Sequence, residues 1–520
     1  MILDLIGNRT VADLLTERTA RTPDKPWLIF ESSQGSVAEL TYAQFEDLAA
    51  VTAYGLSRNG VGRGDRFVVH LDNSVEYLAC LFAAAYLGAV VVPSNTANTP
   101  DELAHVIGLT RPRLVVTSPQ YVTALEEALR DTALPVTRVV VGDAPGWLPW
   151  ADLQSGSRRE PVRLDPEEPL EIMFTSGTTS RPRGVVLTHA NWLWSGERGS
   201  RGMHMEESDR FLACLPLFHV NAQSLSMLNA LTSNATLILV PRFSATAYLD
   251  QVRRHRATHL SMVAMMVRTL LAQPASPQDS HHAVRRVTYA INVTEAELHE
   301  FEARFGMTLT NGYGLSEAMT EVIVSPLFGP RRWPSMGLPA TGRQIRLVDD
   351  SGADVPRGAP GEIIIHGVPG RTIMKGYFED PEATARTIQD GWLHTGDVAY
   401  QDDLGYLYFV DRVKDIIKRA GENISASEVE SVIARHPAVE AVAVVAVPDA
   451  IRDEAVKACI VLRPGHRLDE VELREFCGQH LSAFKVPTIV EFRESLPMTS
   501  LGKIEKKLLR DPVPGTGEVS

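Results

Sequence analysis

Hydrophobic and polar positions alternate along the N-terminal third of the chain in two rhythms. Apolar residues recur every three or four positions at 11–19, 42–58 and 99–107, which predicts amphipathic helices. Short runs rich in β-branched residues, such as 66–70 and 139–141, predict buried strands. Helices that alternate with such strands are typical of parallel sheets covered by helices.

The longest apolar stretch covers residues 77–92 and is divided by Gly88. A membrane-spanning helix needs about 20 apolar residues, so this stretch is too short to insert into a membrane. We interpret it as a buried helix, 77–87, followed by a buried strand, 89–92.

The pattern changes in the C-terminal half. Between 345 and 376, turn signals crowd around short strands such as 362–365, which predicts a small antiparallel sheet or barrel. A new alternation of helices and strands then covers 427–480. We place a domain boundary between these two regions, near Lys414.

Composition limits the class of protein. A chain of 520 residues is too long for one core, and 44% hydrophobic with 22% charged residues is ordinary for a globular protein. The net charge of −13 disfavours nucleic-acid partners. Asp4 and Asn8 interrupt the apolar segment that a secretory signal would need. The four scattered cysteines fit isolated core residues in a reducing compartment, so we expect a cytoplasmic protein.

A loop rich in hydroxyl groups and glycine lies at 174–184, between predicted strands 171–174 and 185–187. Its small residues let backbone N–H groups converge on phosphate oxygens, and its hydroxyls add further donors. It lacks the Gly-Lys-Ser/Thr ending of a Walker loop. A plain polar hairpin is the simpler alternative. The candidate phosphate-binding residues are Thr175, Ser176, Gly177, Thr178, Thr179 and Arg183.

A second candidate segment reads Asn-Gly-Tyr-Gly-Leu-Ser-Glu at 311–317. Its two glycines let the backbone approach a planar base, on which Tyr313 can stack. Glu317 offers a hard oxygen to Mg²⁺. Taken alone, the string also fits a turn that opens a helix, with Glu317 as a capping carboxylate.

Three further segments carry polar residues of interest. The first, 391–397, ends in Asp397, whose carboxylate can accept from two vicinal hydroxyls. The second, 411–424, is rich in charge, and such runs are usually solvated faces. The third, 497–503, reads Pro-Met-Thr-Ser-Leu-Gly-Lys and ends in Lys503. An isolated lysine near a C-terminus is ordinarily a solvated charge.

Together and in this order, the five segments resemble those of the adenylate-forming superfamily, which includes acyl- and aryl-CoA ligases, luciferase and peptide-synthetase adenylation domains. The resemblance covers about residues 10–510. The texture is most similar to bacterial crotonobetaine/carnitine–CoA ligases, for instance in Arg-Arg-Trp-Pro-Ser at 331–335.

The resemblance implies an α/β fold in two domains. A large N-terminal domain, 1–410, would hold two helix-covered sheets plus a small β-barrel. A hinge at 411–415, with Lys414 at its centre, would lead to a small mobile α+β lid, 416–510. We expect the tail 511–520 to be disordered.

It also implies roles for particular residues. Lys503, carried by the lid, would act in the first half-reaction, and Lys418 in the second. Glu317 and Thr175 would hold Mg²⁺. His219 would lie between the acyl pocket and the thiol channel, although a packed strand-end histidine is the alternative. The implied cofactor-binding residues beyond the phosphate loop are Asn311, Gly312, Tyr313, Gly314, Ser316, Asp397, Arg412 and Gly421.

Two departures from the family pattern are visible. Ser180 and Arg183 stand where glycine and lysine are usual, and Ala-Ile-Asn-Val-Thr at 290–294 replaces a Gly-Gly-Ala turn beside the acyl pocket. The residues implied to line that pocket are His219, Val220, Asn221, Asn292 and Gly312. Because Val220-Asn221 is neutral, a short, branched or aryl neutral acid is favoured over a quaternary ammonium acid.

The implied activity is ATP-dependent carboxylic acid–CoA ligation, with ATP, Mg²⁺ and coenzyme A as cofactors and a small carboxylic acid as partner. An acyl adenylate and pyrophosphate would form first, and a CoA thioester and AMP second. Alternatives are transfer to a carrier-protein thiol, an amine or nitrite, or a luciferase-like oxygenation. A non-catalytic nucleotide-binding regulator is disfavoured because it would have no need of Lys503. The sequence predicts no particular oligomeric state.

Overall fold

The computed structural model describes residues 4–130, 132, 134–175, 182–290, 293–349, 351–412, 416–497, 504 and 506–510. The chain forms two compact units. Unit 1 comprises Met1–Thr96, Ile107–Phe174 and Gly184–Asp411; unit 2 comprises Ala97–Val106, Thr175–Arg183 and Arg412–Ser520. Lys414 and the tail lie outside the described residues, so the hinge and the disordered tail stay predictions.

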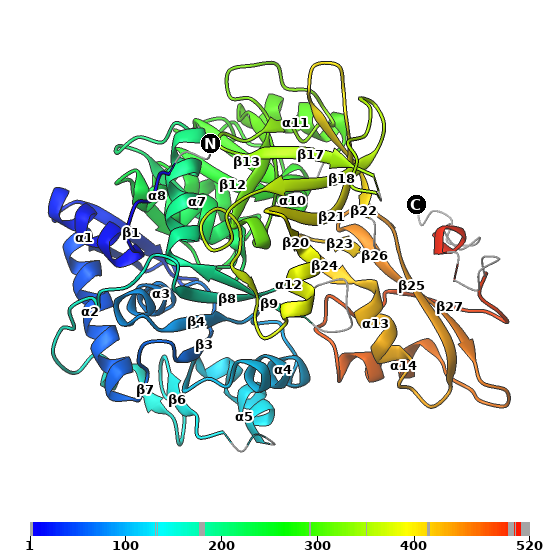
Figure 1. Cartoon of the computed structure of the whole chain (residues 1–520), viewed down its shortest axis with the longest axis horizontal. Coiled ribbons are helices and arrows are strands. Elements are labelled where there is room, and N and C mark those ends of the chain that lie inside the picture. The colour runs from blue at the N-terminus through cyan, green and yellow to red at the C-terminus, as the bar shows by residue number, and fades with distance from the viewer. Residues whose placement is uncertain are drawn as a thin grey trace. The chain divides into compact units, whose positions relative to one another are not determined.

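An eight-stranded, largely parallel sheet holds the first group of predicted strands (Figure 1). Its order is β19-β9-β8-β4-β3-β5-β6-β7. The bounds are β3 (Arg66–His70), β4 (Val90–Pro93), β5 (Leu114–Thr117), β6 (Thr137–Val140), β7 (Leu148–Pro149), β8 (Pro169–Thr175), β9 (Arg183–Thr188) and β19 (Gly376–Tyr377). Helices of this region are α3 (Val75–Leu87), α4 (Pro100–Thr110), η1 (Pro119–Tyr121), α5 (Val122–Arg130) and α6 (Trp150–Leu153).

The predicted buried helix is α3, and local chemistry fixes both of its ends. The Ser74 hydroxyl accepts a hydrogen bond from the backbone N–H of Tyr77 at 3.1 Å, as an N-cap should. Gly88 ends the helix with φ of +66°, a conformation that glycine adopts without strain. The helix is buried from Tyr77 onward, as expected of an apolar run too short for a membrane.

A nine-stranded sheet forms the second layer, in the order β16-β15-β14-β13-β12-β10-β11-β1-β2. The bounds are β1 (Pro26–Glu31), β2 (Val37–Thr41), β10 (Arg210–Ala213), β11 (Thr236–Leu239), β12 (His259–Val263), β13 (Arg286–Ala290), β14 (Leu309–Leu315), β15 (Thr320–Val324) and β16 (Leu338–Pro339). Its helices are α1 (Val11–Arg21), α2 (Tyr42–Arg58), α7 (His189–Gly202), the π-helix η2 (Ala222–Leu228), α8 (Asn229–Thr232), α9 (Tyr248–Arg254), α10 (Ala264–Leu271), α11 (Glu295–Phe305) and the 3₁₀ turn η3 (Ser316–Ala318). One apolar core includes residues of both sheets, and a second lies against β12 and β13.

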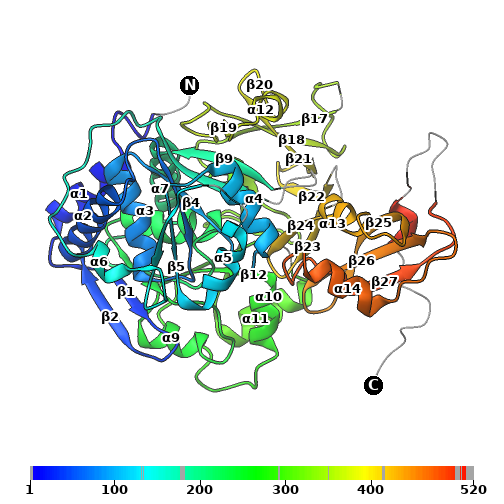
Figure 2. The same ribbon diagram turned by 90° about the horizontal axis from the view of Figure 1, so that it is seen from below.

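A five-stranded antiparallel sheet confirms the small sheet predicted from the turn signals (Figure 2). Its strands are β17 (Gln344–Val348), β18 (Gly361–His366), β20 (Ile388–Gln389), β21 (Trp392–Gln401) and β22 (Leu407–Arg412). Helix α12 (Pro381–Thr387) precedes β20.

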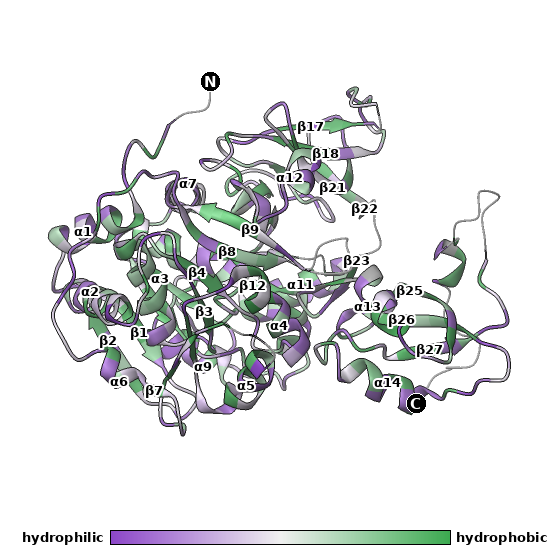
Figure 3. Ribbon diagram, turned by 60° about the horizontal axis from the view of Figure 1, so that its bottom comes forward, coloured by the Kyte–Doolittle hydropathy of each residue, from purple (hydrophilic) through white to green (hydrophobic). Residues whose placement is uncertain are grey.

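Unit 2 is built on a second five-stranded sheet, and the alternation predicted over 427–480 corresponds to two of its strands and two helices. Its strands are β23 (Ile416–Arg419), β24 (Glu422–Ser425), β25 (Val439–Asp449), β26 (Asp453–Leu462) and β27 (Ile489–Phe492). Helices α13 (Ala426–Ile433) and α14 (Glu470–Gly478) pack against one face, and η4 (Lys506–Leu509) follows β27. Figure 3 shows β25 and β26 as mainly hydrophobic. The opposite face is also apolar and is covered by residues near the C-terminus, including Leu496 and Leu509.

The expected α/β architecture is confirmed: two helix-covered sheets, a half-barrel sheet and a smaller C-terminal α+β unit. All four cysteines are unpaired and buried, as expected of core residues. Among the helices in the described part of the chain, none combines the length and apolar character that crossing a membrane requires.

Candidate active site

The structure joins two of the predicted segments in unit 1. Tyr313 lies on β14 and Asp397 on β21, 84 residues apart in sequence, and the Tyr313 hydroxyl donates a hydrogen bond to Asp397 Oδ2 at 2.7 Å. Asp397 is 1% exposed, whereas Tyr313 is half-buried. The tyrosine predicted to stack on a base and the aspartate predicted to hold a ribose are therefore direct neighbours.

Glu317 is held by its backbone as well as by its side chain. The backbone N–H of Met374 donates to Glu317 O at 2.7 Å, and the Tyr377 hydroxyl donates to Glu317 Oε1 at 3.0 Å. The buried Arg343 guanidinium donates to Ala318 O, the next carbonyl, at 2.6 Å. Burial lowers the pKa of Arg343 to about 9. Sequence reasoning missed Arg343 and Tyr377, since nothing local marks them as partners of η3.

The donor set around Glu317 can be compared with the needs of Mg²⁺. No group of three or more His, Cys, Asp or Glu side chains suited to a metal ion occurs among the residues that the structure describes. Mg²⁺ in nucleotide enzymes is usually bound by one or two carboxylates plus substrate phosphates. A single hard-oxygen ligand such as Glu317 fits that pattern.

The ends of the predicted phosphate loop are placed by strands. Strand β8 ends at Thr175 and β9 begins at Arg183, within two residues of the predicted strand ends at 174 and 185. At Gly184 a Cβ would meet Ile172 Cγ2 at 2.6 Å, so the glycine allows close strand packing. The residues between, Ser176, Gly177, Thr178 and Thr179, lie outside the described residues, and their phosphate contacts stay predictions.

His219 closes a tight turn, where its backbone N–H donates to Pro216 O at 3.0 Å. Two buried amides secure this turn. The backbone N–H of Leu217 donates to Asn73 Oδ1 at 2.8 Å, and Gln223 Nε2 donates to Leu217 O at 2.8 Å. Neither amide was predicted, although Asn73 closely follows the carboxyl end of β3, where a polar residue is a recognisable signal.

Gln223 also connects the turn to a buried carboxyl group. Its Nε2 donates to Glu171 Oε1 at 2.7 Å, and Trp192 Nε1 donates to Glu171 Oε2 at 3.1 Å. Glu171 is fully buried. Burial raises the pKa of Glu171 to about 7, against the opposing effect of the two hydrogen bonds. This network fixes the π-helix η2, and π-helical segments are frequent at functional sites.

Polar side chains lie next to two of the predicted acid-binding residues, Asn221 and Gly312. Asn221 accepts a hydrogen bond from Ser261 Oγ at 2.7 Å. Ser261 on β12 is in register with Thr288 on β13, and Thr288 Cγ2 lies 3.5 Å from where a Cβ of Gly312 would be. Val220 and Asn221 are partly exposed. Asn292 lies outside the described residues.

A buried ion pair follows on the same side of Gly312. Glu321 Oε1 lies 2.6 Å from the position that a Cβ of Gly312 would occupy, so only glycine fits there without a shift. Glu321 Oε2 is 3.7 Å from Arg198 Nη2, and both side chains are buried. Burial raises the pKa of Glu321, and Arg198 opposes that shift. No feature of the local sequence indicated this pair.

In unit 2, the residues predicted for the second half-reaction surround a hairpin. Lys418 lies on β23, and its backbone N–H donates to Glu454 Oε2 at 2.6 Å. Strand partners Arg419 and Glu422 are joined by Ala420 and Gly421, with φ of +51° and +87°. Two positive φ angles are what a type I′ turn requires. The turn therefore explains why a glycine occurs at position 421, in addition to its predicted role at a ligand.

Two further predicted site residues are the catalytic Lys503 and the cofactor-binding Arg412. Lys503 lies outside the described residues. Arg412 ends β22, and its side chain is not among those described. Their roles stay predictions.

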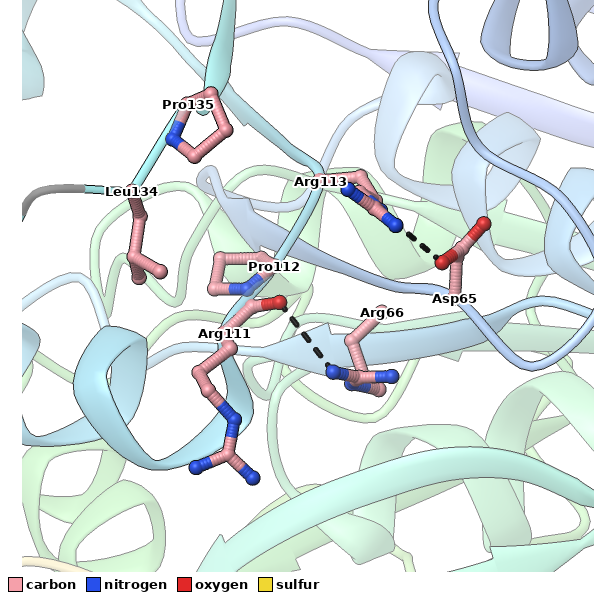
Figure 4. Close-up of a pocket in the computed structure, with 7 residues that line it drawn as sticks. All are labelled: Asp65, Arg66, Arg111, Pro112, Arg113, Leu134 and Pro135. Carbon is pink, nitrogen blue, oxygen red and sulfur yellow. Dashed lines mark hydrogen bonds and ion pairs between the residues drawn. The ribbon is translucent and has the colours of Figure 1, made fainter.

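A separate pocket of about 210 Å³ lies where β3 and β5 begin (Figure 4). Arg113 Nε is 3.2 Å from Asp65 Oδ1, and Arg66 Nη2 donates to Arg111 O at 3.4 Å. Strands β3, β4 and β8 are parallel, so the pocket lies at the edge of the sheet where the strands begin. The predicted phosphate loop follows Phe174 at the opposite edge, where β8 ends. The pocket therefore does not belong to the candidate active site.

Two family models and a set of curated relatives match this chain. The family model of AMP-binding enzymes matches residues 15–378, and the model of their C-terminal domain matches 428–503. A crotonobetaine/carnitine–CoA ligase of Salmonella agona is 38% identical, over 98% of this chain and 100% of the relative.

Solved structures are similar to this chain over nearly its whole length. An o-succinylbenzoate CoA synthetase from Bacillus subtilis, a double mutant bound with a product analogue, has a TM-score of 0.85 at 26% identity, over 96% of this chain and 98% of that one. An amide bond synthetase from Marinactinospora thermotolerans has a TM-score of 0.85 at 27% identity, over 96% and 99%. The expected superfamily is thereby confirmed: the chain belongs to the family of AMP-binding enzymes.

Proposed function

We propose that this AMP-binding enzyme is an ATP-dependent carboxylic acid–CoA ligase. The observation that carries the proposal is a pair of hydrogen bonds, from the Tyr313 hydroxyl to Asp397 and from the Tyr377 hydroxyl to Glu317. We assign base stacking to Tyr313, ribose binding to Asp397 and Mg²⁺ binding to Glu317. The similarity to CoA ligases over nearly the whole chain supports the same activity.

In the first half-reaction, the substrate carboxylate attacks the α-phosphorus of ATP. The P–O bond to pyrophosphate breaks, and an acyl adenylate forms. The barrier is largely electrostatic, because two anions meet and charge builds on phosphate oxygens. Mg²⁺, when bound at Glu317 and the phosphates, supplies opposing charge. Asp397 accepts hydrogen bonds from the ribose hydroxyls, and it must exchange or share its bond with Tyr313 to do so.

In the second half-reaction, the coenzyme A thiol loses its proton and its sulfur attacks the acyl carbon. The C–O bond to the phosphate breaks, and AMP leaves with the electron pair. Lys418 and Gly421 are the residues of unit 2 that we assign to this step. His219 is assigned to the passage between the acid and the thiol, where Asn73 and Gln223 hold its turn.

The test is acid-dependent pyrophosphate release over a panel of carboxylic acids, with and without coenzyme A. We expect release with at least one acid, and a CoA thioester by mass spectrometry when coenzyme A is added. Asp397→Asn should weaken ATP use by roughly tenfold or more, because a neutral amide is a poorer acceptor. Tyr313→Phe is the matched control, because it removes only the hydroxyl that donates to Asp397 and keeps both the aromatic ring and the Asp397 carboxylate. The absence of release with every acid would refute the proposal.

A second candidate function is transfer of the acyl group to a different nucleophile. The similarity to an amide bond synthetase favours an amine, and a carrier-protein thiol or nitrite would use the same adenylate. Pyrophosphate release without thioester formation, followed by product only with an added amine, carrier protein or nitrite, would favour this candidate.

A further inference from the structure

The buried pair of Glu321 and Arg198 requires an explanation that the proposed activity does not supply. Glu321 is 7% exposed, yet none of the described residues donates a hydrogen bond to its Oε1. Buried carboxylate oxygens are normally satisfied, because leaving one without a donor is costly. Arg198 balances the charge from 3.7 Å, which is too long for a good hydrogen bond.

Small and polar residues lie near Glu321. Gly312 has no side chain, and a Cβ at this position would lie only 2.6 Å from Glu321 Oε1. Thr288 lies beside Gly312, and Ser261 is the strand partner of Thr288. Ser261 Oγ donates a hydrogen bond to Asn221, the residue that precedes η2. Asn221, Ser261 and Thr288 are thus polar residues on the same side as Gly312 and Glu321. The adjacent residue Tyr313 contacts Asp397 at the nucleotide side.

We propose that the acid substrate carries an amino or hydroxyl group and that the Glu321 carboxylate accepts a hydrogen bond from it. This inference rests on the proposed function and specifies its substrate class. An N–H or O–H donor satisfies the orphaned carboxylate, whereas an alkyl group leaves it unsatisfied. A trimethylammonium group has no N–H to donate, and a second carboxylate would be repelled by Glu321.

The other charged groups nearby are already engaged. Arg343, the second buried guanidinium, donates to the carbonyls of Ala318 and Thr372, both at 2.6 Å. Arg198 faces Glu321 from helix α7. Arg343 thus has two acceptors and Arg198 faces a carboxylate, whereas Glu321 Oε1 has no donor among the described residues.

The experiment compares matched acids in pyrophosphate release. One series is 4-amino-, 4-hydroxy- and 4-methylbenzoate; the other is 4-aminobutyrate, 4-hydroxybutyrate, pentanoate, 4-trimethylammoniobutyrate and glutarate. On the scaffold that turns over, we expect kcat/KM for the amino or hydroxy acid to exceed that of the methyl analogue roughly 10- to 100-fold, as for a hydrogen bond to a charged group. The better of the two donors identifies which group the site takes.

Variants link the preference to Glu321. Glu321→Gln should reduce an amino preference about tenfold, because the acceptor loses its charge. The double variant R198M/E321L removes both charges, so that no buried ion is left without its partner, and the preference should fall to about one. Glu300→Gln, an exposed charge removal on α11, should keep the wild-type preference. Thermal melts establish that each variant is folded.

Two results would overturn the inference. One is an unchanged preference in R198M/E321L while pyrophosphate release continues. The other is a wild-type enzyme that favours the methyl, trimethylammonium or dicarboxylate analogue. Both differ from failure of the proposed function, in which no acid releases pyrophosphate at all.

Discussion

Replacing Glu171 with glutamine should change how the stability of the protein depends on pH. Glu171 is fully buried, and both of its oxygens accept hydrogen bonds, from Gln223 Nε2 and Trp192 Nε1. No described cation forms an ion pair with it. Glutamine keeps the shape of the side chain and removes the ionisation.

The magnitude follows from the pKa. Burial raises the pKa of Glu171 from 4.5 to about 7 in the folded chain, so ionised Glu171 lowers the free energy of unfolding by roughly 3 kcal/mol above pH 7. Between pH 4.5 and pH 7 the folded state binds more protons than the unfolded state. The free energy of unfolding therefore falls as the pH rises through this range. Below pH 4.5 the cost is absent.

Glu171→Gln removes that cost but turns an amide NH₂ toward one of the two donors. A donor left unsatisfied costs about 1–3 kcal/mol at any pH. The variant should therefore be less stable than wild type near pH 5 and about equally or more stable near pH 8. The difference between the two proteins should change by roughly 3 kcal/mol across that range.

Urea unfolding followed by tryptophan fluorescence, repeated from pH 5 to pH 8, measures this difference. The matched control is Glu126→Gln, in which an exposed glutamate also accepts from a tryptophan indole, Trp147 Nε1, at 3.0 Å. That variant should follow wild type at every pH. Parallel stability curves for wild type and Glu171→Gln would refute the assignment of a raised pKa to Glu171.

Four further outcomes are expected. Lys503→Ala should lower pyrophosphate release by roughly 10²–10³ and leave thioester formation from a supplied acyl adenylate nearly intact; equal losses in both assays would contradict the role of the lysine. Lys414→Pro should show the opposite defect, with thioester turnover lost and adenylation retained, because proline fixes a φ angle that a hinge must change; normal turnover would mean that the hinge is misplaced. Glu317→Gln should raise the Mg²⁺ concentration needed for half-maximal release, and an unchanged Mg²⁺ curve would remove Glu317 from the metal site. His189→Gln should flatten the acid limb of the stability curve: burial lowers the pKa of His189 from 6.5 to about 4, so the unfolded state binds the proton more tightly and stability is lost as the pH falls through that range. An acid limb as steep as that of wild type would contradict the lowered pKa of His189.

The elements that the sequence predicts well are those with local signals. Helix α2 begins after the capping residue Thr41 and covers the predicted 42–58 in full. Helix α3 ends at a glycine that the sequence displays plainly. The five motif segments were recognisable for the same reason, because each is a continuous string.

What the sequence did not predict depends on contacts between distant residues. Gln223 meets Glu171 across 52 positions, and Asn73 meets the turn of His219 from 144 positions away, at Leu217. The π-helix carries no periodicity that separates it from an α-helix. Glu321 is likewise identified as a neighbour of Gly312 only by the fold. The turn at Ala420–Gly421 was within reach of sequence reasoning, which assigned the glycine to a ligand instead.

The second apolar face of the β25–β26 sheet has a consequence for how the protein can be shortened. Leu509 is fully buried there, Ile504 packs against the same cluster, and Lys506 Nζ lies 2.7 Å from Glu430 Oε1. Ile504 comes directly after Lys503. A protein cut before residue 498 would thus lose more than a lysine, since it would expose a hydrophobic sheet surface of the kind that drives self-association. An adenylation-defective protein is therefore better made by point substitution than by truncation.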